Sequence, residues 1–131
     1  MRILIAEDDL TSRELLLELL GPYGNCDTAA DGREAVKVFR AALKSMPYDL
    51  VCMDIMMPHV DGQQALKEIR DIERTEGIAK SREVRVIMTT ALCDPKSITE
   101  AFHEGGASSY IVKPITRDKL LEKLRKFGMV K

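Results

Sequence analysis

The sequence predicts an α/β protein in which helices cover both faces of a five-stranded parallel sheet. Two observations favour this class: short apolar runs alternate with amphipathic segments along the whole chain, and the first, third and fourth runs are almost entirely apolar. Strands that are covered on both faces have this composition. The runs expected to form strands are residues 3–6, 25–29, 50–53, 84–88 and 109–112.

Residues that begin or end helices separate these runs. Asp94 and Pro95 make a good helix start, because aspartate caps helix N-termini and proline is favoured at the first helical position, so a fourth helix is expected over residues 94–104. Gly21 and Pro22 end the first helix at residue 20. The other helices are indicated by Asp31-Gly32 with Ala35, Val36 and Phe39, by Gly62 with Ala65, Leu66, Ile69 and Ile72, and by Leu120, Leu121, Leu124 and Phe127.

The composition is typical of one soluble globular domain. The chain has 131 residues, a formal net charge of -1 and 45% hydrophobic residues, and no apolar run approaches the length of a membrane span. This charge implies no general attraction to nucleic acid or membrane. Cys26, Cys52 and Cys93 are odd in number and widely spaced, which favours reduced thiols in a cytoplasmic protein over a disulfide framework or a zinc site.

Charged and hydroxyl side chains follow four of the five expected strands. In an open parallel sheet, ligands bind beyond the carboxyl ends of the strands, and these ends share one edge. Each residue taken alone is more often a helix cap, a turn residue or a solvated lysine, but their joint placement favours a site. They are Glu7, Asp8 and Asp9 after the first strand, Asp54 after the third, Thr89 and Thr90 after the fourth, and Lys113 and Pro114 after the fifth.

Asp54 is the most unusual of these residues, because it follows an apolar strand and precedes three more apolar residues. Burying a carboxylate without partners is costly, and crowded acids repel one another unless a cation joins them. We therefore expect Mg²⁺, the usual ion of oxygen ligands, with Lys113 as partner to a carboxylate or phosphoryl group. An ionised Asp54 beside that cation is a competent nucleophile toward phosphorus.

Four segments in this order resemble the receiver domain of bacterial two-component response regulators, a family that includes the chemotaxis regulators. They are the acidic pair in ILIAEDD, the acidic residue in VCMDIMMPHVDG, the hydroxyl in VIMTTA and the lysine in YIVKP. The resemblance covers residues 1–131 as a single receiver domain. It implies the flavodoxin-like fold, a doubly wound five-stranded parallel sheet of order 2-1-3-4-5 with five helices.

The resemblance also implies roles for individual residues. Asp54 is expected to be the phosphoacceptor, and Thr90 and Lys113 are expected to contact the phosphoryl group. Thr90 is chosen over Thr89 because alanine follows it, as in the family pattern. Tyr110 is expected at the family's aromatic switch position. The peptide bond between Lys113 and Pro114 is expected to be cis.

The expected metal ligands complete this site. The resemblance implies that Mg²⁺ binds Asp9 directly, Asp8 mainly through water, Asp54, and the backbone carbonyl of Met56. Met56 lies two residues after the acceptor, and Leu92 lies two residues after Thr90. Neither apolar side chain can orient a hydrolytic water by hydrogen bonding. We therefore expect slow self-dephosphorylation.

The implied function is phosphorelay signal transduction by a switch that catalyses only its own phosphorylation and slow dephosphorylation. A sensor histidine kinase or a phosphotransfer protein would donate the phosphoryl group from a phosphohistidine. The face built from the fourth helix, the fifth strand and the fifth helix would then change. The sequence ends soon after the fifth helix, so we expect no output domain and a downstream protein target rather than nucleic acid or membrane. A monomer and a phosphorylation-dependent dimer both stay open.

Three other functions fit parts of this pattern. An Mg²⁺-dependent aspartyl phosphatase typically needs a second carboxylate two residues after the nucleophile, where this chain has Met56. A flavodoxin-like cofactor carrier needs a phosphate-binding loop after the first strand, where Glu7, Asp8 and Asp9 would repel phosphate. A receiver-like binding module that is no longer phosphorylated stays open as an alternative, although the complete set of site residues favours phosphorylation.

Overall fold

The computed structural model describes residues 1–57, 59–91 and 106–130. A five-stranded parallel sheet in the order β2-β1-β3-β4-β5 forms its centre, which confirms the predicted fold class and strand order. The strands are β1 (Arg2–Ala6), β2 (Asn25–Ala29), β3 (Leu50–Asp54), β4 (Arg85–Thr90) and β5 (Ser109–Val112). Both β3 and β4 extend further toward the carboxyl edge than their apolar runs indicate.

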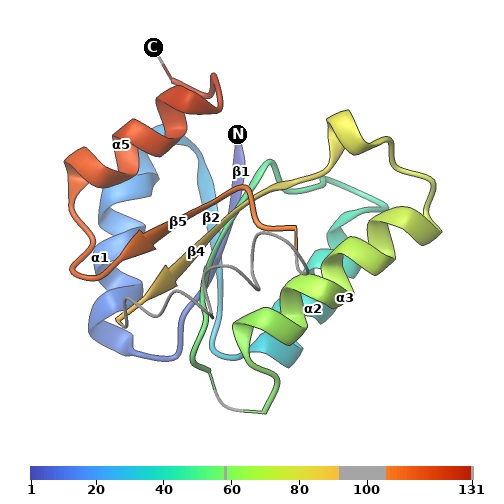
Figure 1. Ribbon diagram of the computed structural model, residues 1–131, viewed down its shortest axis with the longest axis horizontal. Helices are drawn as coiled ribbons and strands as arrows, with labels where there is room; N and C mark the ends of the chain where they lie inside the picture. The colour runs from blue at the N-terminus through green and yellow to red at the C-terminus, as the bar shows by residue number, and fades with distance from the viewer. Residues whose placement is uncertain (58, 92–105, 131) are drawn as a thin grey trace.

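Helices lie on both faces of the sheet (Figure 1), with α1 and α5 on one face and α2 and α3 on the other. The helices are α1 (Leu10–Leu20), α2 (Gly32–Ala42), α3 (Gly62–Thr75) and α5 (Arg117–Lys126), with single 3-10 turns at η1 (Gly21–Tyr23) and η2 (Lys80–Arg82). The helix expected over residues 94–104 lies outside the described residues. No helix in the described part of the chain is long and apolar enough to cross a membrane.

The central strands divide their side chains between two apolar layers, because successive residues of a strand point to opposite faces. In β1, Leu4 and Ala6 belong to the layer under α2 and α3, whereas Ile3 and Ile5 belong to the layer under α1 and α5. All four side chains are fully buried. Burial on both faces explains why these strands are continuous apolar runs in the sequence.

Two Asp-Gly pairs bring helix starts close to the loops beyond the sheet. Asp31 and Asp61 are the N-caps of α2 and α3, and each carboxylate accepts a hydrogen bond from a backbone N–H of the first turn. A Cβ atom at Gly62 would overlap the carbonyl oxygen of Asp54, and the Gly62 N–H donates to Ile55 O at 2.8 Å. Glycine therefore lets α3 begin in direct contact with the end of β3.

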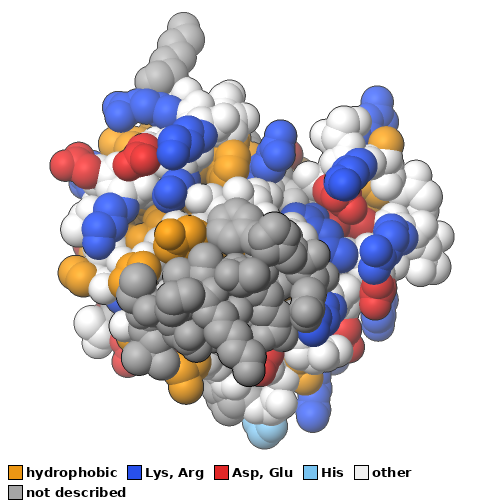
Figure 2. All heavy atoms as spheres, in the orientation of Figure 1, with side chains coloured by type: hydrophobic (Ala, Val, Ile, Leu, Met, Phe, Trp, Pro, Cys, Tyr) orange, Lys and Arg blue, Asp and Glu red, His pale blue; other side chains and the backbone are white. Residues whose placement is uncertain are grey.

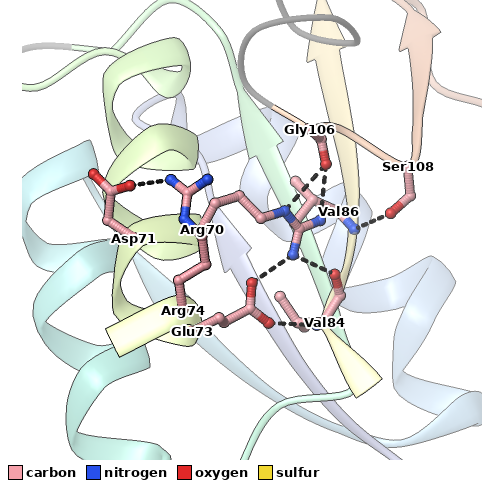
Figure 3. A network of polar contacts seen from close by, with 8 residues as sticks. All are labelled: Arg70, Asp71, Glu73, Arg74, Val84, Val86, Gly106 and Ser108. Atoms are coloured by element: carbon pink, nitrogen blue, oxygen red, sulfur yellow. Dashed lines mark hydrogen bonds and ion pairs between the residues drawn. The ribbon is translucent and has the colours of Figure 1, made fainter. Parts of the chain in front are cut away.

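A buried ion pair ties α3 to β4 and to the segment before β5 (Figure 3). Arg70 Nη1 donates to Glu73 Oε1 at 2.6 Å and to Val84 O at 2.9 Å. Its Nε and Nη2 both donate to Gly106 O, at 3.1 and 2.9 Å. The second Glu73 oxygen accepts from Val84 N at 2.7 Å. Four of these hydrogen bonds come from the Arg70 guanidinium group, so removal of the arginine would take these donors from Glu73 Oε1 and from the carbonyl oxygens of Val84 and Gly106.

The position of Glu73 corrects one expectation. The polar stretch of residues 73–85 indicates the end of the third helix and a solvated connection. Glu73 does lie near the end of α3, but its side chain is only 1% exposed. Burial raises the pKa of the Glu73 carboxyl, while the hydrogen bonds from Arg70 and from the Val84 N–H oppose the rise. The charge is tolerated because it is paired and hydrogen-bonded.

Replacement of Arg70 tests how much this network contributes to the stability of the fold. Arg74, on the same helix, supplies a matched control. Arg74 pairs with Asp71, and both side chains are at least 66% exposed. We expect Arg70→Met to lower the free energy of unfolding by about 3–5 kcal/mol, because it leaves a buried carboxylate unpaired. Arg74→Met should cost about 0–1 kcal/mol. Equal losses in urea denaturation of the two variants would contradict this account.

Candidate functional site

Four strand ends meet at the carboxyl edge of the sheet. The strands β1, β3, β4 and β5 are consecutive neighbours, and the register pairs Asp54 with Thr89. Thr90 pairs with Val112, the residue before Lys113. Ligands of open parallel sheets bind at this edge. The strand order therefore gathers residues that are far apart in the sequence.

The Lys113 ammonium group bridges two buried carboxylates at the centre of this edge. Its Nζ lies 2.8 Å from Glu7 Oε1 and 3.1 Å from Asp54 Oδ2. Glu7 is fully buried and Asp54 is 6% exposed, whereas the Lys113 side chain is 22% exposed. Buried charges are tolerated when they are paired, so this contact explains how Asp54 can occupy an otherwise apolar position.

One lysine does not neutralise both acids. Burial raises the pKa of Glu7 to about 7, a hydrogen bond with Asp54 adds to the rise, and Lys113 opposes it. Burial lowers the pKa of Lys113, but its hydrogen bonds to the two carboxylates outweigh burial and leave that pKa above its ordinary value. Glu7 is therefore not fully ionised at neutral pH, and a second cation at the edge would favour its charged form.

Glu7, Asp8 and Asp54 form a group that could hold such a cation. One carboxylate oxygen from each lies within 4.8 Å of the others, and of the three side chains only Asp8 is exposed. The backbone of Met56 turns beside this group, because its N–H donates to Asp54 Oδ1 at 3.1 Å. The Met56 side chain itself is 64% exposed. A set of oxygen donors with one open side suits Mg²⁺.

Asp9 lies outside this group. It is the N-cap of α1, where its carboxylate accepts a hydrogen bond from Ser12 N at 2.9 Å. That hydrogen bond is the main reason why the pKa of Asp9 is lowered. The resemblance implies Asp9 rather than Glu7 as a ligand, whereas the structure groups Glu7 with Asp8 and Asp54. A serine three residues after an aspartate at a helix start could have indicated the cap.

The structure also places the remaining predicted site residues. Thr90 is buried at the last position of β4, and its carbonyl oxygen accepts from Lys113 N at 2.7 Å. The Lys113–Pro114 peptide bond is cis, as expected. Tyr110 is half-buried in β5, and Lys123 Nζ lies 5.8 Å from the centre of its ring. Leu92 lies outside the described residues.

With this geometry, comparison with known proteins decides the family. The sequence model of the family described as the response regulator receiver domain matches residues 3–125. The chain belongs to this family. The CheY chemotaxis protein of Bacillus subtilis is 35% identical over 127 residues, which are 95% of this chain and 95% of that protein. Receiver domains are phosphoacceptor switches of two-component phosphorelay signalling rather than classical enzymes.

Solved structures agree with the family. A chain of the CheX–CheY–BeF3–Mg²⁺ complex from Borrelia burgdorferi has a TM-score of 0.84 and 30% identity, covering 100% of this receiver domain and 90% of that chain. A chain of the complex between Ypd1 and the Ssk1 receiver domain from Saccharomyces cerevisiae has a TM-score of 0.84 and 28% identity. The match covers 98% of this chain and 88% of that chain.

Some relatives are far longer than this chain. The hybrid signal transduction histidine kinase I of Dictyostelium discoideum is 35% identical over 123 residues, which are 92% of this chain but only 7% of that kinase. Receiver domains therefore occur both as nearly whole proteins, as in the Bacillus relative, and as small parts of larger ones.

Proposed function

We propose that this receiver domain accepts a phosphoryl group on Asp54 and thereby switches a protein-binding surface. The observation that supports this most directly is the convergence of Lys113, Glu7 and Asp8 on Asp54. The proposed donor is a phosphohistidine on a sensor histidine kinase or on a phosphotransfer protein. The solved complex of Ypd1, a histidine phosphotransfer protein, with the Ssk1 receiver supports a donor of this class.

The chain's own residues account for the proposed chemistry. An oxygen of the Asp54 carboxylate attacks phosphorus while the bond to the leaving nitrogen breaks. Lys113 moves from Asp54 toward the incoming phosphoryl oxygens, which carry more negative charge. Thr90 donates its hydroxyl hydrogen bond to the same oxygens. Positioning and charge neutralisation of this kind supply most of the catalysis in phosphoryl transfer.

The proposed metal is Mg²⁺, held by Glu7, Asp8, Asp54 and the backbone carbonyl of Met56. All four donors are oxygens, and the pKa of Glu7 is raised by burial and by its hydrogen bond with Asp54, so a second cation beside it would favour the ionised ligand. When bound, Mg²⁺ neutralises negative charge on the acids and on the phosphoryl group. Asp9 is left out of this ligand set because its carboxylate caps α1.

The proposed output is a change at β5 and α5, together with residues 94–104. Rotation of Tyr110 would alter the contact between its ring and Lys123 of α5. Lys and Arg side chains are interspersed with Asp and Glu on the face drawn in Figure 2, so a downstream protein is a better proposal than nucleic acid. We propose that residues 1–131 act as a single cytoplasmic receiver domain, either as a monomer or as a phosphorylation-dependent dimer.

The acceptor is tested by intact mass after incubation with acetyl phosphate and Mg²⁺. We expect the wild type to gain one phosphoryl group, and Asp54→Asn to gain none, because its amide cannot attack phosphorus. Asp71→Asn, which changes an exposed acid on α3, should behave as the wild type. A wild type that keeps its fold but gains no phosphoryl group, from acetyl phosphate or from a kinase, would favour a binding module that is not phosphorylated.

The decay of the phosphorylated form tests the role of Met56. We expect the wild type to lose its phosphoryl group about tenfold more slowly than Met56→Asn, because an amide can orient the attacking water and a thioether cannot. The exposed Met46 supplies a control substitution, Met46→Asn, which should not change the rate. Decay is followed by mass after the acetyl phosphate has been removed. Faster decay in the wild type than in Met56→Asn would overturn the prediction.

A further inference from the structure

We propose that Thr89 is a positioning residue for the phosphoacceptor, through a hydrogen bond from its hydroxyl group to the Asp54 carboxyl group during phosphoryl transfer. This inference rests on the proposed role of Asp54. It concerns a different residue from Thr90, whose proposed contact is with the phosphoryl oxygens.

Thr89 is the direct neighbour of Asp54 across the sheet. The two residues are partners in the β3–β4 register, and Ile55 N donates to Thr89 O at 3.0 Å, so the backbones are joined at this point. Partner residues of adjacent strands lie about 4.8 Å apart and point their side chains to the same face. The Thr89 side chain therefore lies beside that of Asp54.

The alternation of side chains along the strands shows which face of the sheet carries the Thr89 side chain. Ile87, two residues before Thr89, and Ile111, its partner in β5, both belong to the apolar layer under α1 and α5. Lys113 lies two residues beyond Ile111 and contacts Asp54. The Thr89 hydroxyl group therefore lies at the carboxyl end of this apolar layer. It is next to the ion pair with Lys113, the only ionic contact that Asp54 makes among the described residues.

The hydroxyl group of Thr89 is buried without a partner. The residue is 1% exposed, and its Oγ1 has no hydrogen-bond partner within the described part of the chain. A buried hydroxyl group that stays unpaired is costly, and valine would fill the same space without this cost. A catalytic role is one of the physical reasons why a native structure keeps a buried polar group unpaired.

Phosphoryl transfer would create that partner. In the unphosphorylated state, Asp54 Oδ2 accepts from Lys113 and Oδ1 accepts from Met56 N. When one carboxylate oxygen bonds to phosphorus, the leaving group keeps the electron pair of the bond that breaks. The other oxygen becomes the carbonyl oxygen of an acyl phosphate, and Lys113 is drawn to the new phosphoryl charge. Thr89 then donates a hydrogen bond to the carboxyl oxygen that Lys113 contacted before the transfer. No proton is transferred between the two groups.

The test compares Thr89→Val with Thr89→Ser. Valine keeps the shape and removes the hydroxyl group, whereas serine keeps the hydroxyl group. We expect Thr89→Val to be phosphorylated by saturating acetyl phosphate about 5- to 20-fold more slowly than the wild type, as for one lost hydrogen bond. Thr89→Ser should stay within about twofold of the wild type. Affinity for Mg²⁺, measured by calorimetry, should be the same in all three proteins.

Thermal unfolding of the unphosphorylated proteins separates positioning from packing. We expect Thr89→Val to unfold at the same temperature as the wild type or higher, because an unpaired buried hydroxyl group has been replaced by an apolar group. Slower phosphorylation without loss of stability supports the proposal. Equal rates in the valine variant and the wild type would overturn it, and so would a serine variant as slow as the valine one. A wild type that is not phosphorylated on Asp54 at all would instead refute the proposed function, and this inference with it.

Discussion

The contact of Lys113 with Glu7 and Asp54 is the interaction on which the rest of the site depends. It joins the ends of β1, β3 and β5, and it lets two carboxylates stay buried at the carboxyl edge of the sheet. It also leaves the edge short of positive charge, because one ammonium group faces two acids and Asp8 lies beside them. A site with this imbalance favours a divalent cation and an electrophilic phosphoryl group.

The fold positions these groups by topology rather than by local sequence. The order β2-β1-β3-β4-β5 makes four strand ends adjacent, and Gly62 lets α3 start against the backbone of Asp54. At the other end of α3, Arg70 bonds to the carbonyl oxygens of Val84 and Gly106. The helix that begins beside Asp54 is therefore also fixed to the segments just before β4 and β5.

Much of this arrangement could be predicted from the sequence, because apolar runs and strand-end residues follow from the chemistry of a covered parallel sheet. The direction of individual side chains could not be predicted in this way. Glu7 and Asp9 are both acids after β1, and only the structure shows that one turns toward Lys113 while the other caps α1. The burial of Glu73 could not be predicted because it depends on an ion pair with Arg70, three residues earlier on the same helix.

The most direct test of this account is the Mg²⁺ affinity of Asp8→Asn and Asp9→Asn, measured by calorimetry beside the wild type. Asparagine caps helices as well as aspartate does, so Asp9→Asn should stay folded and bind Mg²⁺ within about twofold of the wild type. Asp8→Asn should bind at least about tenfold more weakly, because it loses a charged ligand. Wild-type affinity should also fall below pH 7, since Glu7, whose pKa is about 7, must lose its proton to bind metal. Weak binding by Asp9→Asn, with normal binding by Asp8→Asn, would contradict the ligand set and the account built on it.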